Sequence, residues 1–328
     1  MGINTNHTYW IKSHGGRGHY IRFRDTSNIY NTPSAILGRF TTATNRNKWF
    51  LKKVSGMFKL ACHENNSYGL SRSTNNGCVI SAITASNENS DITFVKLNAT
   101  KNIYKIRLTL SGNTYKYLTT SDDSDLSSIS WEPAISNDMA QTQEWRFIDV
   151  NSTTVINVPS GRNCNWNQFS SDVYDQISSS SGCSWCCMLD VANIYGPSSY
   201  VPTSMPSSSW GPNGVAWNNL PIGCSATIQG DSSYATESLC LAAIKAEIDI
   251  NRPVIVKLQH VSGYHYVVAY GYLNSGTAME DILVFDPASK TGYPAPSSYI
   301  DGNDWTLAES ASYNYNSVLT KTIKKTSN

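Results

Sequence analysis

SGNTYKYLTTS (residues 111–121) and TQEWRFIDV (residues 142–150) decide the fold of the first half of the chain. Both segments alternate apolar and polar residues, and the first begins with the turn-forming residues Ser, Gly and Asn. Alternation with a period of two indicates strands that are buried on one face. The two segments therefore predict one strand around Leu118 and a second strand that carries Trp145 and Phe147.

The same pattern occurs three times in the first 150 residues. Each repeat opens with an alternating aromatic segment, continues with a strand that carries a tyrosine, and closes on an aromatic strand. The opening segments start at Tyr9, Phe58 and Tyr104, the middle strands at Tyr20, Tyr68 and Tyr117, and the closing strands span 47–50, 91–94 and 143–147. A unit of this length cannot bury its apolar face alone, so we expect the three to close around a shared axis. Trp49, Phe94 and Trp145 are predicted to be core residues.

These repeats resemble the ricin-B-type β-trefoil, whose repeats end in a Gln-x-Trp signature, here Gln143 to Trp145. The resemblance covers about residues 1–150 and implies an all-β, lectin-like domain, which we bound at 1–152. It also implies a glycan as a candidate ligand, held by an Asp just after the apolar pair of the second strand. This chain has Arg22, Ser71 and Thr119 at those places, and Asp25 lies nearby but out of register. Protein contacts alone are the alternative role, because a fold does not fix a function.

Composition limits the class of partner. The chain has 328 residues, of which 40% are hydrophobic and 15% charged, with a formal net charge of +1. This balance gives no support for nucleic acid or an anionic membrane as the main partner. No apolar run approaches the roughly 18 residues of a membrane span. The polar, aromatic surface composition predicts a secreted protein, although MGINTNHTYW lacks a secretory signal, so we expect a mature form or another export route.

Eight cysteines form an even set, which permits disulfides. The candidate pairs are Cys62 with Cys78, Cys224 with Cys240, and Cys164 with Cys186 or Cys187. For the first pair, two unpaired small core residues are the alternative. Cys183, Cys186 and Cys187 lack a distant second Cys or His cluster, so we predict no metal site and no cofactor.

The sequence pattern changes in residues 153–328, where helical periodicity comes first and apolar strand segments follow. This pattern predicts a second, α+β domain after a turn-rich boundary at 157–161. Helices are predicted at 184–195 and 237–248, and strands at 253–259, 264–272 and 281–287. The first helix is stopped by Gly196 and Pro197, and a loop rich in Ser, Pro and Trp follows at 197–222.

Four residues in this half have the order of a nucleophile and its helpers. Cys183 lies at the start of the first helix, where backbone N–H groups and the helix dipole favour a thiolate. His265 opens an apolar strand and Asp286 ends the next one, so neighbouring antiparallel strands could bring the two together as base and orienting group. Gln176, seven residues before Cys183, could share an oxyanion hole with the Cys183 backbone N–H.

Other residues near these four have less specific interpretations. His260 is five residues from His265 and follows a strand, so it is interpreted as a surface turn residue. Asp190 is predicted to lie on a solvated helix face, and Asp175 to be a loop carboxylate. Trp185, Gly263, Tyr264 and Trp210 are candidates for the lining of a substrate groove.

The second half resembles the papain-fold cysteine peptidases of the bacteriocin-leader-peptidase-like group. The resemblance covers about 170–290 and rests on DVYDQ (172–176), GCSWCCMLDVANIYG (182–196), RPVIVKLQ (252–259), GYHYVVAYGY (263–272) and ILVFDP (282–287). It implies a papain-like fold and carries the family's roles to Gln176, Cys183, His265 and Asp286. The chain departs from the family at one place, because Ser184-Trp185 replaces the common Gly-Pro after the cysteine.

The sequence therefore predicts a multidomain protein: an all-β β-trefoil followed by an α+β, papain-like cysteine peptidase domain. We expect a secreted enzyme that hydrolyses peptide bonds in a peptide or protein substrate and is docked on its target by the trefoil. The first alternative is an acyltransferase or deamidase on the same fold. The second is a carbohydrate-binding lectin with an inactive peptidase-like domain.

Overall fold

The computed structural model divides into two units, Met1–Ser152 and Thr153–Asn328. The structure describes residues 3–5, 7–13, 19–23, 34–38, 48–86, 88–98, 103–111, 114–121, 127–136, 142–159, 162–164, 166, 168, 170–177, 182–211, 214–288, 306–313 and 317–328. Among the residues named above, Asp25, Asn47, Ser160 and Gly161 lie outside these ranges.

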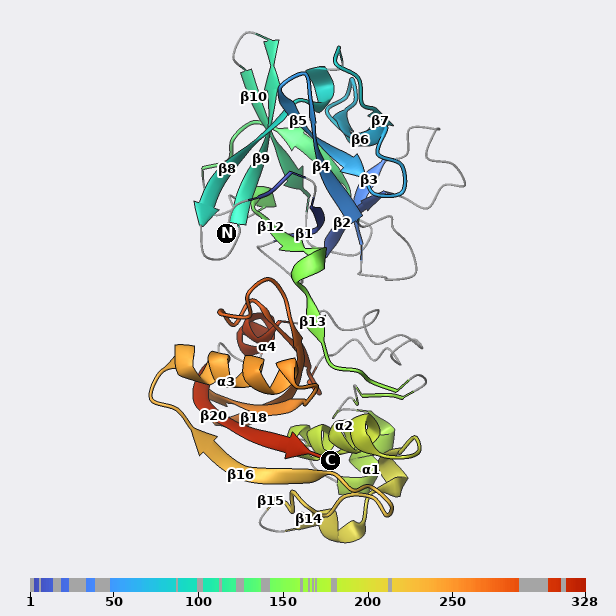
Figure 1. Ribbon diagram of the computed structural model, residues 1–328, viewed down its shortest axis with the longest axis vertical. Helices are drawn as coiled ribbons and strands as arrows, with labels where there is room; N and C mark the ends of the chain where they lie inside the picture. Colours follow the sequence, from blue (N-terminus) through green and yellow to red (C-terminus); the bar gives the residue numbers. More distant parts are fainter. Residues whose placement is uncertain are drawn as a thin grey trace. The chain divides into compact units, whose positions relative to one another are not determined.

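Six strands of the first unit pair into a closed ring (Figure 1). They are β1 (Thr8–Ser13), β4 (Lys48–Val54), β5 (Met57–Cys62), β8 (Ile92–Asn98), β9 (Ile103–Leu110) and β12 (Trp145–Asp149). Each pairs antiparallel with the next, and β12 closes the ring on β1. A closed ring leaves no free strand edge, so every strand in it has two hydrogen-bonded neighbours.

Three hairpins, one from each repeat, cap this ring. They are β2 (Tyr20–Phe23) with β3 (Ala35–Gly38), β6 (Tyr68–Arg72) with β7 (Cys78–Ala82), and β10 (Thr114–Thr120) with β11 (Ile129–Glu132). Bridges Ser34–Val79, Ile36–Ser128 and Gly77–Ser130 join each hairpin to the other two. A six-stranded ring with three linked hairpins is a β-trefoil. Two short 3₁₀ helices, η3 (Glu88–Ser90) and η6 (Val150–Ser152), complete the described elements of this unit.

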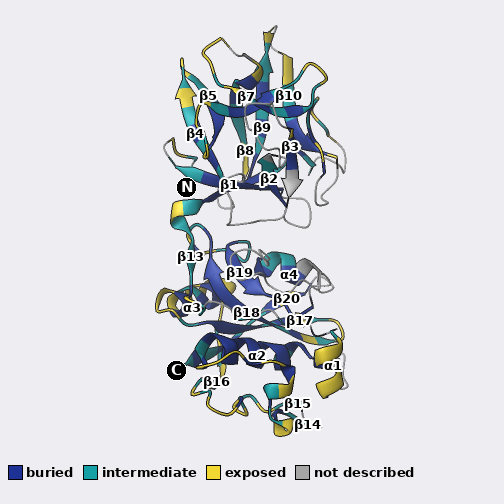
Figure 2. Ribbon diagram, turned by 90° about the vertical axis from the view of Figure 1, so that its right-hand side faces the viewer, coloured by how far each residue is buried: buried dark blue, intermediate teal, exposed yellow. Residues whose placement is uncertain are grey.

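The core of the trefoil repeats one arrangement. Trp49 and Trp145 are fully buried, and the indole N–H of each donates to a second-strand carbonyl, Ile21 O or Leu118 O, at 2.8 Å. Buried residues concentrate in the ring strands (Figure 2). Phe94 packs against this core as predicted, with its ring centroid 5.3 Å from that of Phe147, but it is only partly buried, and Ile92 is the fully buried residue of that strand.

The Gln-x-Trp signature acts as a structural clamp. The Gln143 side chain is fully buried and donates to Thr119 Oγ1 at 3.0 Å and Pro133 O at 2.8 Å. Its amide oxygen accepts from the Ile135 backbone at 3.0 Å. The side chain thereby fastens the loop before β12 to the third hairpin, which agrees with its interpretation as a core and turn residue.

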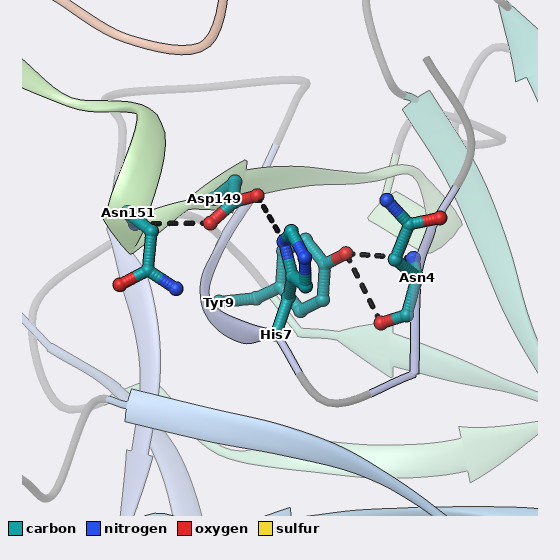
Figure 3. Close-up of polar contacts among 5 residues, drawn as sticks. All are labelled: Asn4, His7, Tyr9, Asp149 and Asn151. Atoms are coloured by element: carbon teal, nitrogen blue, oxygen red, sulfur yellow. Dashed lines mark hydrogen bonds and ion pairs between the residues drawn. The ribbon is translucent and has the colours of Figure 1, made fainter.

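The N-terminal segment is held to the end of β12 (Figure 3). His7 Nδ1 contacts Asp149 Oδ2 at 2.5 Å, and Asp149 Oδ1 accepts from the Asn151 backbone at 2.9 Å. Tyr9 OH accepts from the Asn4 backbone N–H at 2.8 Å. These contacts fix the start of the ring to its end, so they serve the closure of the barrel.

The predicted disulfides are not formed: no disulfide joins the cysteines in the described part of the chain. Cys62 and Cys78 are buried in the trefoil core, and burial raises the pKa of the Cys62 thiol to about 12 and that of Cys78 further. They therefore match the alternative of small, unpaired core residues. Cys224 and Cys240 likewise do not form a disulfide with each other.

The second unit is built on a six-stranded antiparallel sheet. Its order is β13 (Thr154–Val155), β18 (Gly263–Tyr272), β17 (Val254–His260), β20 (Val318–Ser327) and β16 (Thr227–Ser233), and β19 (Ile282–Phe285) also pairs with β18. The central strands β17 and β18 supply continuous apolar runs that are buried on both faces.

Four helices flank this sheet: α1 (Ser171–Ile177), α2 (Cys183–Tyr195), α3 (Glu237–Asp249) and α4 (Leu307–Tyr313). Figures 1 and 2 show α2 on one face and α3 on the other. The segment between α2 and β16 holds η7 (Pro202–Ser204), η8 (Ser207–Ser209) and the hairpin of β14 (Trp210–Gly211) with β15 (Gly214–Val215). Thr236 caps α3 by accepting from the Leu239 backbone at 3.2 Å.

Candidate active site

Helix α2 positions Cys183 as its first residue. The Cys186 backbone N–H donates to Gly182 O at 2.9 Å, which closes the first turn directly over Cys183. Gly182 packs closely on α1, since a Cβ there would lie 2.6 Å from Ile177 Cδ1. Eleven of the residues of α2 are buried, so the helix runs through the interior and presents its N-terminal N–H groups next to the Cys183 side chain.

His265 lies between Cys183 and Asp286. His265 Nε2 donates to Asp286 Oδ1 at 2.8 Å, and the imidazole also forms a hydrogen bond with the Cys183 thiol. Because Nε2 of His265 is hydrogen-bonded to Asp286, the hydrogen bond with the Cys183 thiol is assigned to Nδ1. The pairing of β18 with β19 brings this about: Val268 pairs with Phe285, so the residue after β19 lies beside the start of β18.

The three side chains are sheltered from water and electrostatically coupled. Cys183, His265 and Asp286 are 6%, 4% and 1% exposed. Burial acts to lower the pKa of His265, but the Asp286 charge and the hydrogen bonds to Asp286 and Cys183 outweigh it and raise that pKa from 6.5 to about 10. The site therefore holds a protonated imidazole at neutral pH, which can stabilise a neighbouring thiolate.

Asp286 is oriented by its own turn. Its Oδ1 accepts from the Ala288 backbone N–H at 2.8 Å in addition to the imidazole. The following residue is tied to the segment before α1, because the Gln168 backbone N–H donates to Pro287 O at 2.9 Å. One backbone N–H thus holds the carboxylate, and the turn that carries it is tied to the segment before α1.

The two glutamines near the site differ in place. Gln176 lies on the exposed side of α1. Gln168, which sequence reasoning missed, is 6% exposed, and its Cβ lies 3.4 Å from where a Cβ on Gly182 would be. No sequence signal singles out Gln168, because it is fifteen residues before Cys183 and in a segment without regular periodicity.

Trp185 is not available to line a groove, which corrects the prediction. It is 2% exposed, and its indole N–H donates to Ser209 Oγ at 3.1 Å, so it anchors η8 against α2. Trp210, in contrast, is half-buried in the short β14–β15 hairpin, where it pairs with Val215.

The other two groove candidates, Gly263 and Tyr264, directly precede His265 on β18. Tyr264 is 51% exposed, with Lys257 Nζ 3.8 Å from its ring centroid. Gly263 has a φ of +155°, a backbone conformation that favours glycine. A Cβ there would meet nothing nearer than His260 at 3.9 Å, so conformation rather than crowding explains the glycine. His260 is the last residue of β17, where it pairs with Gly263, and not part of the turn as predicted. It is half-exposed, with Nδ1 3.0 Å from Ser262 Oγ.

Asp190 is completely buried, which corrects its assignment to a solvated helix face. It lies on the inward side of α2, and its Oδ1 accepts from the Trp166 backbone at 3.4 Å. No described residue forms a hydrogen bond with its Oδ2. Burial raises the pKa of Asp190 well above its ordinary value. Asp175 is exposed on α1 rather than in a loop.

In the first unit, Ser71 and Thr119 occupy two of the positions where the family resemblance would put a sugar-binding Asp, and their side chains form hydrogen bonds within the trefoil. Ser71 and Thr119 are 2% and 6% exposed. The Ser71 hydroxyl donates to Asn89 O at 3.3 Å, and Thr119 is held by Gln143. Arg22 is half-buried.

Within the described ranges, no group of three or more His, Cys, Asp or Glu is placed to hold a metal ion. Of the helices in the described part of the chain, none is long and apolar enough to cross a membrane.

Comparison with known proteins yields similarity at the level of fold. No family profile matches the chain, and no curated protein matches it. The designed three-fold symmetric protein ThreeFoil is 18% identical, with 44% of this chain and 99% of that chain covered and a TM-score of 0.36. The Macrolepiota procera ricin B-like lectin, in complex with lactose, is 15% identical over 45% and 98%, with a TM-score of 0.35. The C-half of an earthworm R-type lectin, in complex with GalNAc, is 13% identical over 43% and 97%, with a TM-score of 0.33. The trefoil assignment rests on the ring and hairpins of this chain itself.

Proposed function

We propose that the second unit is a cysteine-type peptidase in which Cys183 is the nucleophile. The observation that carries the proposal is the position of His265, hydrogen-bonded on one side to Asp286 and on the other to the Cys183 thiol. A nucleophile, its base and an orienting carboxylate in series are what thiol acyl chemistry requires.

Each group has one task. The Cys183 thiolate attacks the peptide carbonyl carbon, and the carbonyl electron pair moves to oxygen. When the tetrahedral intermediate collapses, the C–N bond breaks, and the His265 imidazolium gives its proton to the leaving amine. His265, now neutral, takes a proton from water as that water attacks the thioester. Release of the acid returns the thiolate and imidazolium, and Asp286 keeps the ring in one orientation throughout.

The oxyanion needs hydrogen-bond donors near Cys183. The free N–H groups at the start of α2 provide some of them. Gln168 is the better-placed side-chain amide, because it is buried against Gly182 and tied to the turn after Asp286. Gln176, the residue that the family resemblance suggests, is the alternative.

Hydrolysis by a cysteine variant tests the proposal. The full chain, Cys183→Ala and Cys183→Ser would be compared on denatured casein and on a mixture of quenched fluorescent peptides. Cys240→Ala, which removes a buried thiol from α3, is the matched control. We expect the Cys183 variants to lose about a thousandfold or more in rate and the control to retain activity. Full activity of Cys183→Ala would refute the proposal.

The same triad geometry also fits transfer of the acyl group to an amine, or deamidation of a Gln side chain. Mass spectrometry of the products with an added primary amine separates these outcomes. New amides would identify a transferase, a gain of acid at Gln would identify a deamidase, and free new termini would identify the peptidase.

A second function, glycan binding, is proposed for the first unit. The complete trefoil with three linked hairpins supports it, and ricin B-like and R-type lectins seen with lactose and GalNAc have a similar fold. Because Ser71 and Thr119 are buried, the proposed sugar contact does not use these two residues. A glycan array probed with the full chain tests this role. The absence of any signal above background would contradict it. Secretion, which the composition predicts, is tested separately by locating the protein in producing cells and medium.

A further inference from the structure

The first two turns of α2 hold an unusual set of groups. Cys183, Cys186 and Cys187 lie within five residues, and Asp190 follows one turn later. The mechanism above uses only Cys183. Cys186, Cys187 and Asp190 are all 0% exposed, and Asp190 Oδ2 has no hydrogen-bond partner among the described residues. A buried polar atom left unsatisfied is costly and calls for an explanation.

Helix geometry relates these groups closely. Residues three and four apart lie on one helix face, so Cys183 neighbours Cys186, which in turn neighbours Asp190. The same proximity is evident in the charges that act on Cys186: after burial, Asp190 and Cys183 are the groups that raise the pKa of its thiol. An ideal helix places Cα atoms three residues apart at about 5 Å, within the range that a disulfide spans.

From this arrangement we propose that Cys183 and Cys186 form a reversible dithiol–disulfide site, with Asp190 as the acceptor of the Cys186 proton. Formation of this disulfide requires the distance between the Cβ atoms of Cys183 and Cys186 to shorten by about 1 Å. Cys183 can shift toward Cys186 because it is the first helical residue and follows a glycine that makes no side-chain cap. The shift breaks its contact with His265.

The chemistry is thiol–disulfide exchange with a low-molecular-weight disulfide as the oxidant. The Cys183 thiolate attacks one sulfur of that disulfide, forms a mixed disulfide and expels one thiolate. Asp190 takes the proton of Cys186, whose thiolate attacks Cys183 Sγ and expels the second thiolate. The two protein sulfurs are oxidised by two electrons, and the small disulfide is reduced to two thiolates. The first takes a proton from water, and the second takes the proton held by Asp190. Cys183 is reached first, because it is 6% exposed and Cys186 is fully buried.

Cys187 is the competing partner. It lies four residues from Cys183, about 6 Å away in an ideal helix. After burial, Asp190, Cys183, Cys186 and then Asp286 raise the pKa of its thiol, so Cys187 also lies near the run from Cys183 to Asp190. We choose Cys186 because three residues separate it from Cys183 and the Cα atoms are then about 1 Å closer, and the mapping of the disulfide decides between the two. The proposal requires the position of Cys183 but not its catalytic activity, so it stands apart from the peptidase proposal.

The test uses the reduced full chain carrying Cys224→Ser, which removes the half-buried thiol. The protein is exposed to oxidised glutathione, trapped with iodoacetamide, and analysed by intact-mass and tandem mass spectrometry. We expect the parent and Cys187→Ser to lose two thiols and retain no glutathione, and Cys186→Ser to stop at the mixed disulfide on Cys183. Cys186→Ala should give the same result as Cys186→Ser, and it does so without placing a hydroxyl group in the buried site.

Asp190→Asn keeps the shape of the side chain and tests the proton acceptor. We expect the mixed disulfide on Cys183 to form at the parent rate and then to resolve about tenfold or more slowly. If Asp190 had only a structural role, the ratio of the rate of resolution to the rate of mixed-disulfide formation would be the same in Asp190→Asn as in the parent. Closure in Cys186→Ala, a disulfide mapped to Cys187, or resolution at the parent rate in Asp190→Asn would each overturn the proposal.

Discussion

Replacement of Asp286 by asparagine tests the coupling on which the candidate site depends. The carboxylate is 1% exposed and, through its charge and its hydrogen bond to Nε2, is the main group that raises the pKa of His265 from 6.5 to about 10. Asparagine keeps the shape and an acceptor oxygen but removes the charge. Burial, which acts in the opposite direction, is then no longer outweighed.

The magnitude follows from linkage. A folded-state pKa above the unfolded value stabilises the protein fully below pH 6.5, and this contribution is lost as the pH rises toward about 10. Each pH unit is worth about 1.4 kcal/mol, so the coupling contributes roughly 4 kcal/mol at pH 7 and close to nothing at pH 10. Asp286→Asn should therefore be far less stable than the parent at pH 7, and the difference should shrink as the pH rises.

Two assays measure this change in the full chain. Urea unfolding from pH 7 to 10 gives the stability difference, and NMR of the imidazole Cε1–H gives the His265 titration, with the resonance assigned by its absence from His265→Gln. Asp281→Asn is the matched control, because Asp281 is 3% exposed and contacts Asn274 rather than a histidine. We expect its stability difference from the parent to be the same at pH 7 and pH 10. Titration of His265 near 6.5 in both the parent and Asp286→Asn would refute the reasoning.

Three further predictions concern the oxyanion, the trefoil clamp and the loop after α2. Gln168→Ala should lower kcat for peptide hydrolysis about a hundredfold while Gln176→Ala changes it little, and the reverse order in steady-state kinetics would return the role to Gln176. Gln143→Ala removes one buried and two partly buried hydrogen bonds and should lower the unfolding free energy by about 3 kcal/mol; an unchanged urea midpoint for the trefoil transition would contradict the clamp. Trp185→Phe deletes the indole bond to Ser209 and should cost about 1 kcal/mol, measured as a fall in Tm.

The trefoil could be predicted from sequence because its determinants are local and repeated. Alternation, the tyrosines of the second strands and the Gln143–Trp145 signature recur at a spacing that one chain displays by itself. Phe94 is predicted to pack in the core and does pack against it, but Ile92, two residues earlier on the same face of β8, is the fully buried residue. How deeply each of two residues on one face is buried depends on the neighbouring strands, which the local pattern does not show.

The second unit was predicted where its strands are apolar and missed where they are polar. The strands β17 and β18 read as buried runs, whereas β20, VLTKTIKKTS, lies between β17 and β16 without looking like a central strand. Its polar residues are satisfied by partners far along the chain: Thr326 Oγ1 donates to Pro253 O at 2.7 Å, and Lys324 pairs with Asp231. Such pairings become visible only in the folded chain.

The order of Cys183, His265 and Asp286 was readable because the chemistry of each residue type is distinctive and each lies at the end of a predictable element. The places of Asp190, Trp185 and Gln168 were not readable. Their burial depends on which side of α2 meets the sheet and on how the segment before α1 folds over Gly182, and neither is encoded by periodicity within a short window.

Alkylation of Cys183 by iodoacetamide at pH 6 tests the central claim most directly, with the half-buried Cys224 as an internal reference in the same molecule. The hydrogen bond between the Cys183 thiol and His265 predicts that Cys183 in the parent reacts at least about tenfold faster than in His265→Ala, while Cys224 reacts equally in both. Equal rates for Cys183 in the two proteins would contradict the account.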